Sequence, residues 1–318
     1  MSYLTGKKVL VAGASGLIGS HVVEALLEKG AHVVGTLHRS PAVVDDPRVE
    51  YRTVDLATVE GCRAAAEGCQ VVVMAAADTS GAYMMRNDPV VHVTGNGVLN
   101  SYLIDASWRA GAERVLFVST TTVYPDVDYE VQEEEGFRGD PHPIYFGVGW
   151  MKRYVEKLLA FYQQRLGLQP VILRPTNIYG PRDTFDWERS HVLPALIRRA
   201  LETEGSLEVW GDGSAVRDFL YVDDFVDGLI VSLEECADGQ PINMGSGEPV
   251  TIADSARAIL RLCGRDAADL VFAPDKPTTI PKRVVDLTRA RARLRWAPRV
   301  SFEEGLRRTI AWYRENPV

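Results

Sequence analysis

Three glycines, Gly13, Gly16 and Gly19, fall at three-residue spacing directly after a short apolar run and before a helical pattern. One glycine permits a tight strand-to-helix turn, a second lets backbone N–H groups approach a pyrophosphate, and a third lets the helix pack on the strand. A plain turn also uses glycine, but a triplet between strand and helix favours dinucleotide binding at the helix N-terminus. The expected contacts are Gly13, Ser15, Gly16, Leu17, Ile18 and Gly19.

The end of the second strand pattern, 32–37, selects between the two nicotinamide cofactors. An acidic residue there would hydrogen-bond the ribose 2′-hydroxyl of NAD. Leu37 stands in that place and His38, Arg39 and Ser40 follow it, a set suited to holding a 2′-phosphate by charge-assisted bonds. We therefore expect NADP(H). A solvated loop arginine is the alternative interpretation of Arg39, and it leaves NAD open.

Strand and helix patterns alternate through the first half of the chain. This order predicts right-handed parallel crossovers, and hence an α/β fold with a doubly wound parallel sheet of the Rossmann type. Ligands of such sheets gather at the carboxyl ends of the strands, so Gly13, Ala75–Ala77 and the hydroxyl row Ser119–Thr122 should share one cleft. Threonines are also common in ordinary strands. The strand patterns are 9–12, 32–37, 49–56, 71–77, 114–119 and 171–175, and a long helix is expected at 89–110.

Composition excludes several classes of protein. The 318 residues carry a formal charge of −8 and no basic run, which argues against a nucleic-acid partner. No stretch approaches the roughly 18 consecutive apolar residues of a membrane span, and the polar N-terminus does not resemble a signal peptide. The four cysteines lack C-x-x-C spacing, so we expect reduced thiols and no metal site. A cytoplasmic metabolic enzyme fits these features.

An ordered set of motifs carries a resemblance over essentially the whole chain. These are the glycine turn, Asp55-Leu56, Ala75–Ala77, Asn96, Ser119–Tyr124, Lys152, Arg174–Arg182 and Arg217–Asp224. The chain resembles an extended short-chain dehydrogenase/reductase of the nucleotide-sugar epimerase/dehydratase family. Segments 190–199 and 281–286 are most similar to the GDP-fucose synthase family. Those enzymes are 3,5-epimerase/4-reductases that act on a GDP-4-keto-6-deoxyhexose with NADPH.

The resemblance implies two domains, one for the dinucleotide and one for the nucleotide sugar, and a homodimer. Residues 1–179 and about 214–245 would form the dinucleotide-binding domain, and about 180–213 and 246–318 the nucleotide-sugar region. Arg217 would bind the diphosphate or sugar, although an ion pair with Asp218 is the plain alternative. Further cofactor contacts would be His38, Arg39, Ser40, Asp55, Leu56, Ala75, Ala76, Ala77, Lys152, Pro175, Asn177 and Ile178, and substrate contacts Thr121, Thr122, Asn177, His191, Val192, Arg217 and Arg283.

The chain departs from its family at the central acid. Family members carry a tyrosine four residues before the lysine, whose charge lowers the pKa of the phenol for proton exchange with substrate. Lys152 is in place and Thr120 fits the neighbouring hydroxyl, but Val148 stands where the tyrosine belongs. Tyr145, seven residues before Lys152, would share a helix face with it, about 10 Å along the axis. We expect Tyr145 to pack rather than to act as the acid.

Two more departures affect the epimerisation chemistry. GDP-fucose synthases use a cysteine where this chain has Thr122, and dehydratases carry an Asp-Glu pair where it has Thr121 and Thr122, which disfavours a 4,6-dehydratase. His191 is the surviving member of the epimerase pair, and we expect it to be catalytic rather than structural. The expected function is NADP-dependent epimerisation, 4-keto reduction or both on a nucleotide sugar. The alternatives are an epimerase or dehydratase with a relocated acid/base, and a catalytically impaired sugar-nucleotide-binding protein.

Overall fold

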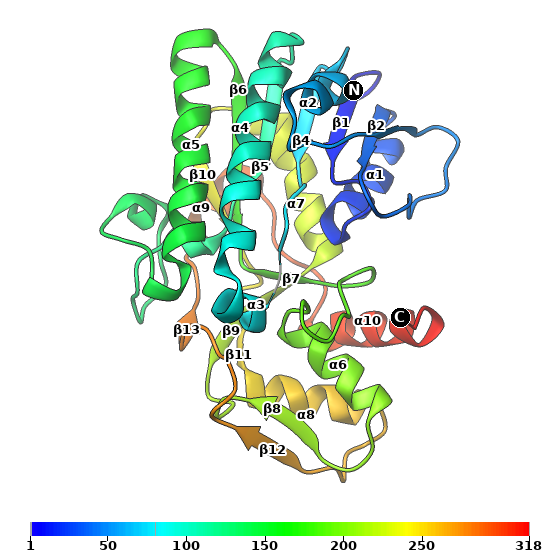
Figure 1. Cartoon of the computed structure of the whole chain (residues 1–318), viewed down its shortest axis with the longest axis vertical. Helices are drawn as coiled ribbons and strands as arrows, with labels where there is room; N and C mark the ends of the chain where they lie inside the picture. The colour runs from blue at the N-terminus through cyan, green and yellow to red at the C-terminus, as the bar shows by residue number, and fades with distance from the viewer. Residues whose placement is uncertain (1, 80, 318) are drawn as a thin grey trace.

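A seven-stranded parallel sheet forms the centre of the computed structural model, which describes residues 2–79 and 81–317. The outermost expected domain bounds, residues 1 and 318, therefore lie outside the described residues. Strand order is β10-β6-β5-β4-β1-β2-β3 (Figure 1), which confirms the expected doubly wound α/β fold. The strands are β1 (Lys8–Ala12), β2 (His32–Leu37), β3 (Glu50–Thr53), β4 (Val71–Met74), β5 (Arg114–Val118), β6 (Gln169–Pro175) and β10 (Pro241–Met244).

Helices cover both faces of this sheet because successive apolar side chains along each strand point to opposite faces. Val9 and Val11 of β1 belong to one core, which packs under α1 (Leu17–Glu28), α7 (Val222–Glu235) and α9 (Thr288–Leu294). Leu10 and Ala12 belong to the opposite core, under α2 (Val59–Ala66), α4 (Thr94–Arg109) and α5 (Phe146–Leu166). Such two-sided burial is typical of parallel sheets.

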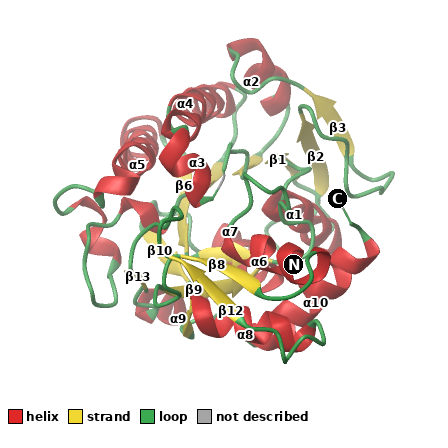
Figure 2. Cartoon of the chain, turned by 60° about the horizontal axis from the view of Figure 1, so that its bottom comes forward, coloured by secondary structure: helices red, strands yellow, loops and turns green. Residues whose placement is uncertain are grey.

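A smaller region lies below the sheet and has its own core, which includes Ile197 and Ile259 (Figures 1 and 2). A four-stranded sheet joins the two regions, and a two-stranded sheet lies at the far end. The elements are β7 (Asn177–Tyr179), β9 (Val216–Tyr221), β11 (Pro249–Thr251) and β13 (Lys282–Arg283) in the first sheet, β8 (Leu207–Trp210) and β12 (Leu270–Ala273) in the second, and the helices α6 (Val192–Glu202), α8 (Ile252–Leu262) and α10 (Phe302–Glu315).

The regions interleave along the chain. Between residues 214 and 245, β9 pairs in the smaller sheet, whereas α7 and β10 pack with the large sheet. Trp296, late in the chain, also packs in the core under α7. The exact division into two domains therefore stays a prediction.

Several expected elements differ from the observed ones at their ends. The helix expected at 89–110 is a 3-10 turn, Pro89–His92, followed by α4 from Thr94, and the backbone between them at Val93 is distorted, with φ −109° and ψ −74°. The third strand, Glu50–Thr53, is shorter than the expected 49–56. The remaining short elements are α3 (Ala82–Asn87) and the 3-10 turns Thr121–Val123, Glu133–Phe137 and Pro143–Tyr145.

Neither a membrane helix nor a metal cluster occurs in the described ranges. No described helix combines the length and apolar character needed to cross a bilayer. No group of three or more His, Cys, Asp and Glu side chains among residues 2–79 and 81–317 is arranged to hold a metal ion. Cys62, Cys69 and Cys236 are buried free thiols, and Cys263 is a half-buried one.

Candidate active site

The glycine turn lies between the ends of β1 and β4. Gly13 has a φ of +84°, and a Cβ at this residue would lie 2.8 Å from the Ala76 Cα. A Cβ at Gly19 would lie 2.0 Å from the Gly13 carbonyl oxygen. Gly16 is exposed as the N-cap residue of α1. The cradle therefore depends on bare backbone beside a helix N-terminus, and it fits the pyrophosphate of a dinucleotide.

The carboxyl ends of β2 and β3 lie beside this turn. The Gly13 N–H donates to Thr36 Oγ1 over 2.9 Å, which ties the turn to β2. His38, Arg39 and Ser40 follow β2 directly and are exposed. Asp55 follows β3, exposed, and its Oδ1 accepts from the Ala57 N–H at 2.9 Å. Leu56, Ser15, Leu17 and Ile18 complete the expected set, with Leu56 buried and the other three half-buried.

The exit of β4 is held by one side chain from α4. Ala75 and Ala76 are half-buried and Ala77 is exposed, in line with the expected cofactor edge. Asn96 Oδ1 accepts from the Asp78 N–H at 2.8 Å, while Asn96 Nδ2 donates to the Asp78 carbonyl at 2.9 Å. The loop after β4 is thereby fixed against α4.

Hydroxyls and one ammonium meet where β5 ends. Thr120 Oγ1 accepts from the Thr122 N–H at 3.2 Å, and Thr121 is buried. The Thr122 hydroxyl is buried without a hydrogen-bond partner among the described residues. Lys152, on α5, donates from Nζ to the Val118 carbonyl over 2.9 Å. Burial lowers the pKa of Lys152 to about 8, and Glu156 partly opposes this.

Val148 and Tyr145 both lie near the start of α5, in different surroundings. Val148 is half-buried and packs against the core under α4 and α5. Tyr145 is the N-cap residue of α5, so the helix begins only after it. The prolines at 141 and 143 keep the chain in a 3-10 turn up to Tyr145. Its phenol lies close enough to Arg217 and Arg283 to act electrostatically on both.

Two arginines stand side by side in the smaller sheet. Arg283 of β13 pairs in register with Arg217 of β9, and their side chains are 4% and 7% exposed. Arg217 donates to Thr279 Oγ1 at 2.8 Å and to backbone carbonyls, whereas Arg283 Nε has no partner in the described part of the chain. Burial lowers the pKa of both guanidiniums.

Asp218 does not pair with Arg217, so the ion-pair alternative is wrong. Its carboxylate accepts instead from the Ser246 N–H at 2.8 Å and the Gly247 N–H at 3.1 Å, and it fixes the loop after β10. Asn177 donates to the Asp218 carbonyl at 3.1 Å. Beside them, Pro175 is buried at the end of β6 and Ile178 is half-buried in β7. The arginine pair therefore carries two buried positive charges with no ion pair among residues 2–79 and 81–317.

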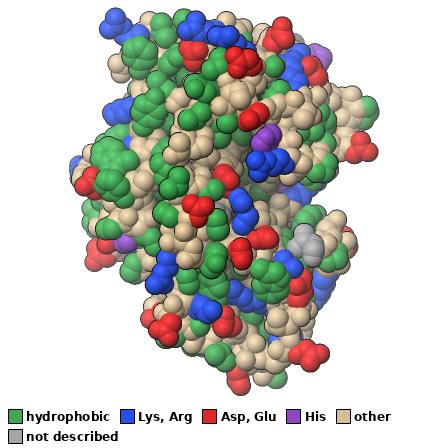
Figure 3. Space-filling view, viewed as in Figure 1, with side chains coloured by type: hydrophobic (Ala, Val, Ile, Leu, Met, Phe, Trp, Pro, Cys, Tyr) green, Lys and Arg blue, Asp and Glu red, His purple; other side chains and the backbone are tan. Residues whose placement is uncertain are grey.

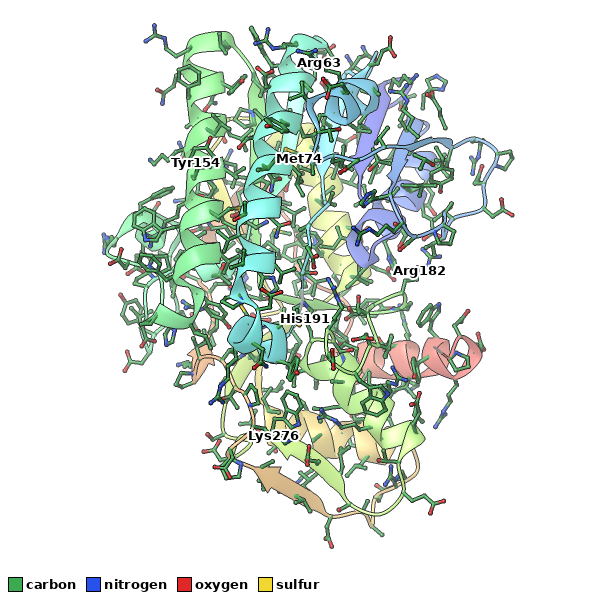
Figure 4. All side chains as sticks on the ribbon, viewed as in Figure 1. Arg63, Met74, Tyr154, Arg182, His191 and Lys276 are labelled. Carbon is green, nitrogen blue, oxygen red and sulfur yellow. The ribbon has the colours of Figure 1, made fainter. Side chains whose placement is uncertain are left out.

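His191 lies at the N-terminus of α6, at the junction of the two regions (Figure 4). The residue as a whole is exposed, yet partial removal of its imidazole from water lowers the pKa of His191, and the nearby His92 lowers it further. The loop after β4 reaches this helix end, since the Gly81 N–H donates to the Arg189 carbonyl at 3.0 Å. Val192 follows His191, half-buried. His191 makes no hydrogen bond to Thr120 or Lys152 among the described residues.

A buried network behind the site was not expected from the sequence. Arg174 forms a two-point ion pair with Glu156, at 3.0 and 2.6 Å, and donates to the Tyr124 hydroxyl at 3.0 Å. Ser119 Oγ donates to Glu156 at 2.6 Å. Ser119, Tyr124 and Arg174 lie within the family motifs quoted above and Glu156 does not, and neither spacing nor periodicity indicates that these residues contact one another. His92 and Asp183 were missed as well, and nothing in their sequence neighbourhood singles them out.

The surface is hollowed between the two regions. Figure 3 shows this indentation on the right-hand side, with basic and histidine side chains close to it. In Figure 4, Arg182 and His191 both lie near the junction of the two regions, with Arg182 the higher of the two. The sheet's carboxyl edge lies above this junction and β9, β13 and α6 lie below it (Figure 1). The expected cofactor residues therefore gather on the upper side, and His191 and the arginine pair on the lower side.

Comparison with known proteins identifies the family. Residues 9–245 match the family described as "NAD dependent epimerase/dehydratase family". The chain belongs to this family. A GDP-L-fucose synthase of Sinorhizobium fredii is 30% identical over 99% of this chain and 98% of its own length. A GDP-mannose 3,5-epimerase of Oryza sativa is 27% identical over 97% of this chain and 82% of its own.

Solved structures agree with this assignment. A UDP-glucuronic acid 4-epimerase from Bacillus cereus, solved with UDP-glucuronic acid and NAD, superposes with a TM-score of 0.84 at 28% identity. The match covers 97% of this chain and 99% of that one. The resemblance to extended short-chain dehydrogenase/reductases is confirmed, as is the expectation of an enzyme, since the curated relatives are enzymes of that family.

Proposed function

We propose that the protein modifies a nucleotide-linked sugar by epimerisation, by reduction of a 4-keto group, or by both. The observation that carries this proposal is the arginine pair Arg217–Arg283, which holds two buried charges without a carboxylate partner among the described residues. Uncompensated buried charge is costly. A diphosphate would satisfy both guanidiniums and the free Arg283 Nε–H, because the arginine fork matches phosphate oxygens.

We assign the dinucleotide to the cradle of Gly13, Gly16 and Gly19, with its adenosine end toward Asp55 and the exposed loop His38–Ser40. The guanidinium of Arg39 lies free to pair with a 2′-phosphate, which supports NADP(H) over NAD. When bound, a nicotinamide dinucleotide supplies or accepts a hydride. Lys152 and Thr120 then flank the sugar position at the end of β5, and the region around α6 would close over the sugar nucleotide.

His191 is the base we assign to epimerisation. A carbonyl at C4 acidifies the neighbouring ring C–H bonds, and a neutral imidazole can accept such a proton. The lowered pKa keeps His191 neutral near pH 7. Thr122 is a much weaker acid than the cysteine of GDP-fucose synthases, so the return of the proton from the opposite face should be slow.

The test is deuterium exchange into a panel of 4-keto-6-deoxyhexoses linked to GDP, UDP and dTDP, incubated with NADPH in D₂O. Ring deuterium or NADPH oxidation with at least one member is the expected result. In His191→Asn the ring exchange should be lost while affinity is kept, whereas His32→Asn, on the far end of β2, should behave as wild type. Binding without exchange or oxidation would favour a binding protein, and absence of binding would overturn the proposal.

We also propose a homodimer formed through α4 and α5. Phe146, Trp150 and Tyr154 recur every four residues on α5, and their side chains are 53%, 42% and 53% exposed. Phe161 of α5 and Tyr102 of α4 are also exposed. Apolar side chains with this periodicity form a stripe on one helix face, and an exposed apolar stripe of this kind is typical of a protein–protein interface. A two-fold axis would bring the same stripe of a second copy onto it.

A further inference from the structure

The ammonium of Lys152 is held on one side only. Among the described residues, Nζ has one hydrogen-bond acceptor, the Val118 carbonyl at 2.9 Å, and lies 4.6 Å from the centre of the Phe117 ring. An ammonium has three N–H donors, so two are left for other partners. Both known contacts come from β5, at the carboxyl edge of the sheet where the reacting groups are expected to meet.

No carboxylate among residues 2–79 and 81–317 neutralises this ammonium by direct contact. Glu156, one turn further along α5, is the acidic group that acts on it. Its two oxygens already accept from Arg174 and Ser119, so Arg174 takes the ion pair. Lys152 is therefore a buried lysine faced by Glu156 on α5, the Phe117 ring on β5 and Arg174 behind them on β6. Burial brings its pKa to about 8, within reach of physiological pH.

The other groups in this corner cannot easily release a proton. Val148, one helical turn before Lys152, is apolar and half-buried. The Tyr124 hydroxyl is bonded to Asn243 and Arg174, and burial raises its pKa to about 12. Thr120 and Thr122 are aliphatic alcohols, which are very weak acids. Lys152 is thus the titratable group best placed at the end of β5 to exchange protons near neutral pH.

We propose that Lys152 is the proton donor of this site, acting through one water molecule beside Val148. This inference rests on the proposed function. As a sugar carbonyl is reduced, an N–H bond of the ammonium breaks, the proton passes through the water to the carbonyl oxygen, and an O–H bond forms while Lys152 becomes a neutral amine. The hydride is supplied by a reduced nicotinamide dinucleotide. In the oxidative direction the amine takes the proton back.

Lys152 must be protonated to donate, and this requirement fixes the direction in which the rate of reduction changes with pH. The single-turnover rate of carbonyl reduction should be flat below the pKa of Lys152 and fall as pH rises through about 8. Lys152→Arg keeps a cation on α5 but cannot release its proton near neutral pH. It should lose about 10²- to 10⁴-fold in rate while dinucleotide affinity, measured by fluorescence titration, is retained.

Position 148 offers a matched pair of variants. Val148→Tyr adds a phenol, which supplies its own proton, so it should raise the rate at least about tenfold and restore activity to Lys152→Arg. Val148→Phe adds the same ring without the hydroxyl and should lower the rate by excluding the relaying water. A rise in both variants would point to packing rather than proton supply and would overturn the proposal.

A readout independent of turnover is the titration of Lys152 by NMR of ¹³C-labelled lysine, assigned with Lys152→Arg. A midpoint near pH 8 supports the proposal, and a midpoint above pH 10 overturns it. Full activity in Lys152→Arg would also refute it and leave the proposed function standing. An inactive wild type beside an active Val148→Tyr would refute only the lysine's role. Inactivity of both, with every sugar nucleotide, would remove the proposed function as well.

Discussion

Arg39 lies exposed directly after β2, and its side chain has no hydrogen bond or ion pair among the described residues. If it holds the 2′-phosphate, Arg39→Ala should weaken NADPH binding roughly 10- to 150-fold, the loss of one or more charge-assisted bonds. NADH affinity should not change. Arg48→Ala, an exposed arginine on the same loop, is the matched control. Isothermal titration giving equal NADPH and NADH affinities for the wild type would contradict the assignment.

Asp183 is a buried carboxyl group whose Oδ2 has no partner in the described part of the chain. Its Oδ1 accepts from the Thr184 N–H at 2.7 Å, but burial dominates and raises the pKa to about 7. The folded state therefore holds a proton that the unfolded state releases above about pH 4. This group makes folding progressively less favourable as pH rises from about 4 to 7, and the loss is complete above that range.

Replacing Asp183 by asparagine removes the charge that has to be buried. Asp183→Asn should match the wild type near pH 4 and exceed its free energy of unfolding by roughly 2–4 kcal/mol at pH 8. Urea denaturation at several pH values measures this difference. Asp275→Asn, at an exposed aspartate, should show no such trend. A constant offset at all pH values would mean that Asp183 does not titrate between the two states.

Helix α5 is joined to β6 by a buried ion pair. Arg174 and Glu156 are fully or almost fully buried, and the carboxylate also accepts from Ser119. Glu156→Gln leaves an uncompensated guanidinium in the interior, so it should cost about 3–5 kcal/mol of stability. Glu303→Gln breaks the exposed pair with Arg261 and should cost less than about 1 kcal/mol. Chemical denaturation of the two variants gives the comparison, and similar losses would contradict it.

Periodicity predicted the elements better than their contacts. Apolar runs such as 9–12 and 71–77 identified the buried strands, because both faces of a parallel sheet are covered. The glycine spacing predicted a turn whose geometry excludes a Cβ at Gly13 and Gly19. By contrast, the proximity of Tyr145 to Arg217 depends on a 3-10 turn and on the distant pairing of β9 with β13. Contacts between segments so far apart leave no trace in local spacing.

The sequence also identified site residues within local motifs and missed those defined by long-range contacts. Lys152 was found because it sits at a fixed place in a helical motif, and Arg217 because of the residues around it. His92 next to His191 was not found, because the two histidines come from separate regions of the fold. The alternative of an ion pair between Arg217 and Asp218 was wrong for a similar reason, because Asp218 accepts hydrogen bonds from the loop after β10 instead.

The whole molecule presents α4 and α5 as a broad outer face (Figure 1), and the exposed aromatic stripe on α5 follows that face. Each protomer of a two-fold dimer would cover the other's stripe, so one substitution acts twice at the interface. The double variant Trp150→Glu, Tyr154→Glu places four carboxylates at its centre and should convert a dimer into monomers. Val271→Glu, at an exposed apolar residue on β12, should leave assembly unchanged. Sedimentation velocity at micromolar concentration distinguishes the two masses. A wild type that sediments as a monomer would refute the dimer, and a double variant that stays dimeric would move the interface to another face.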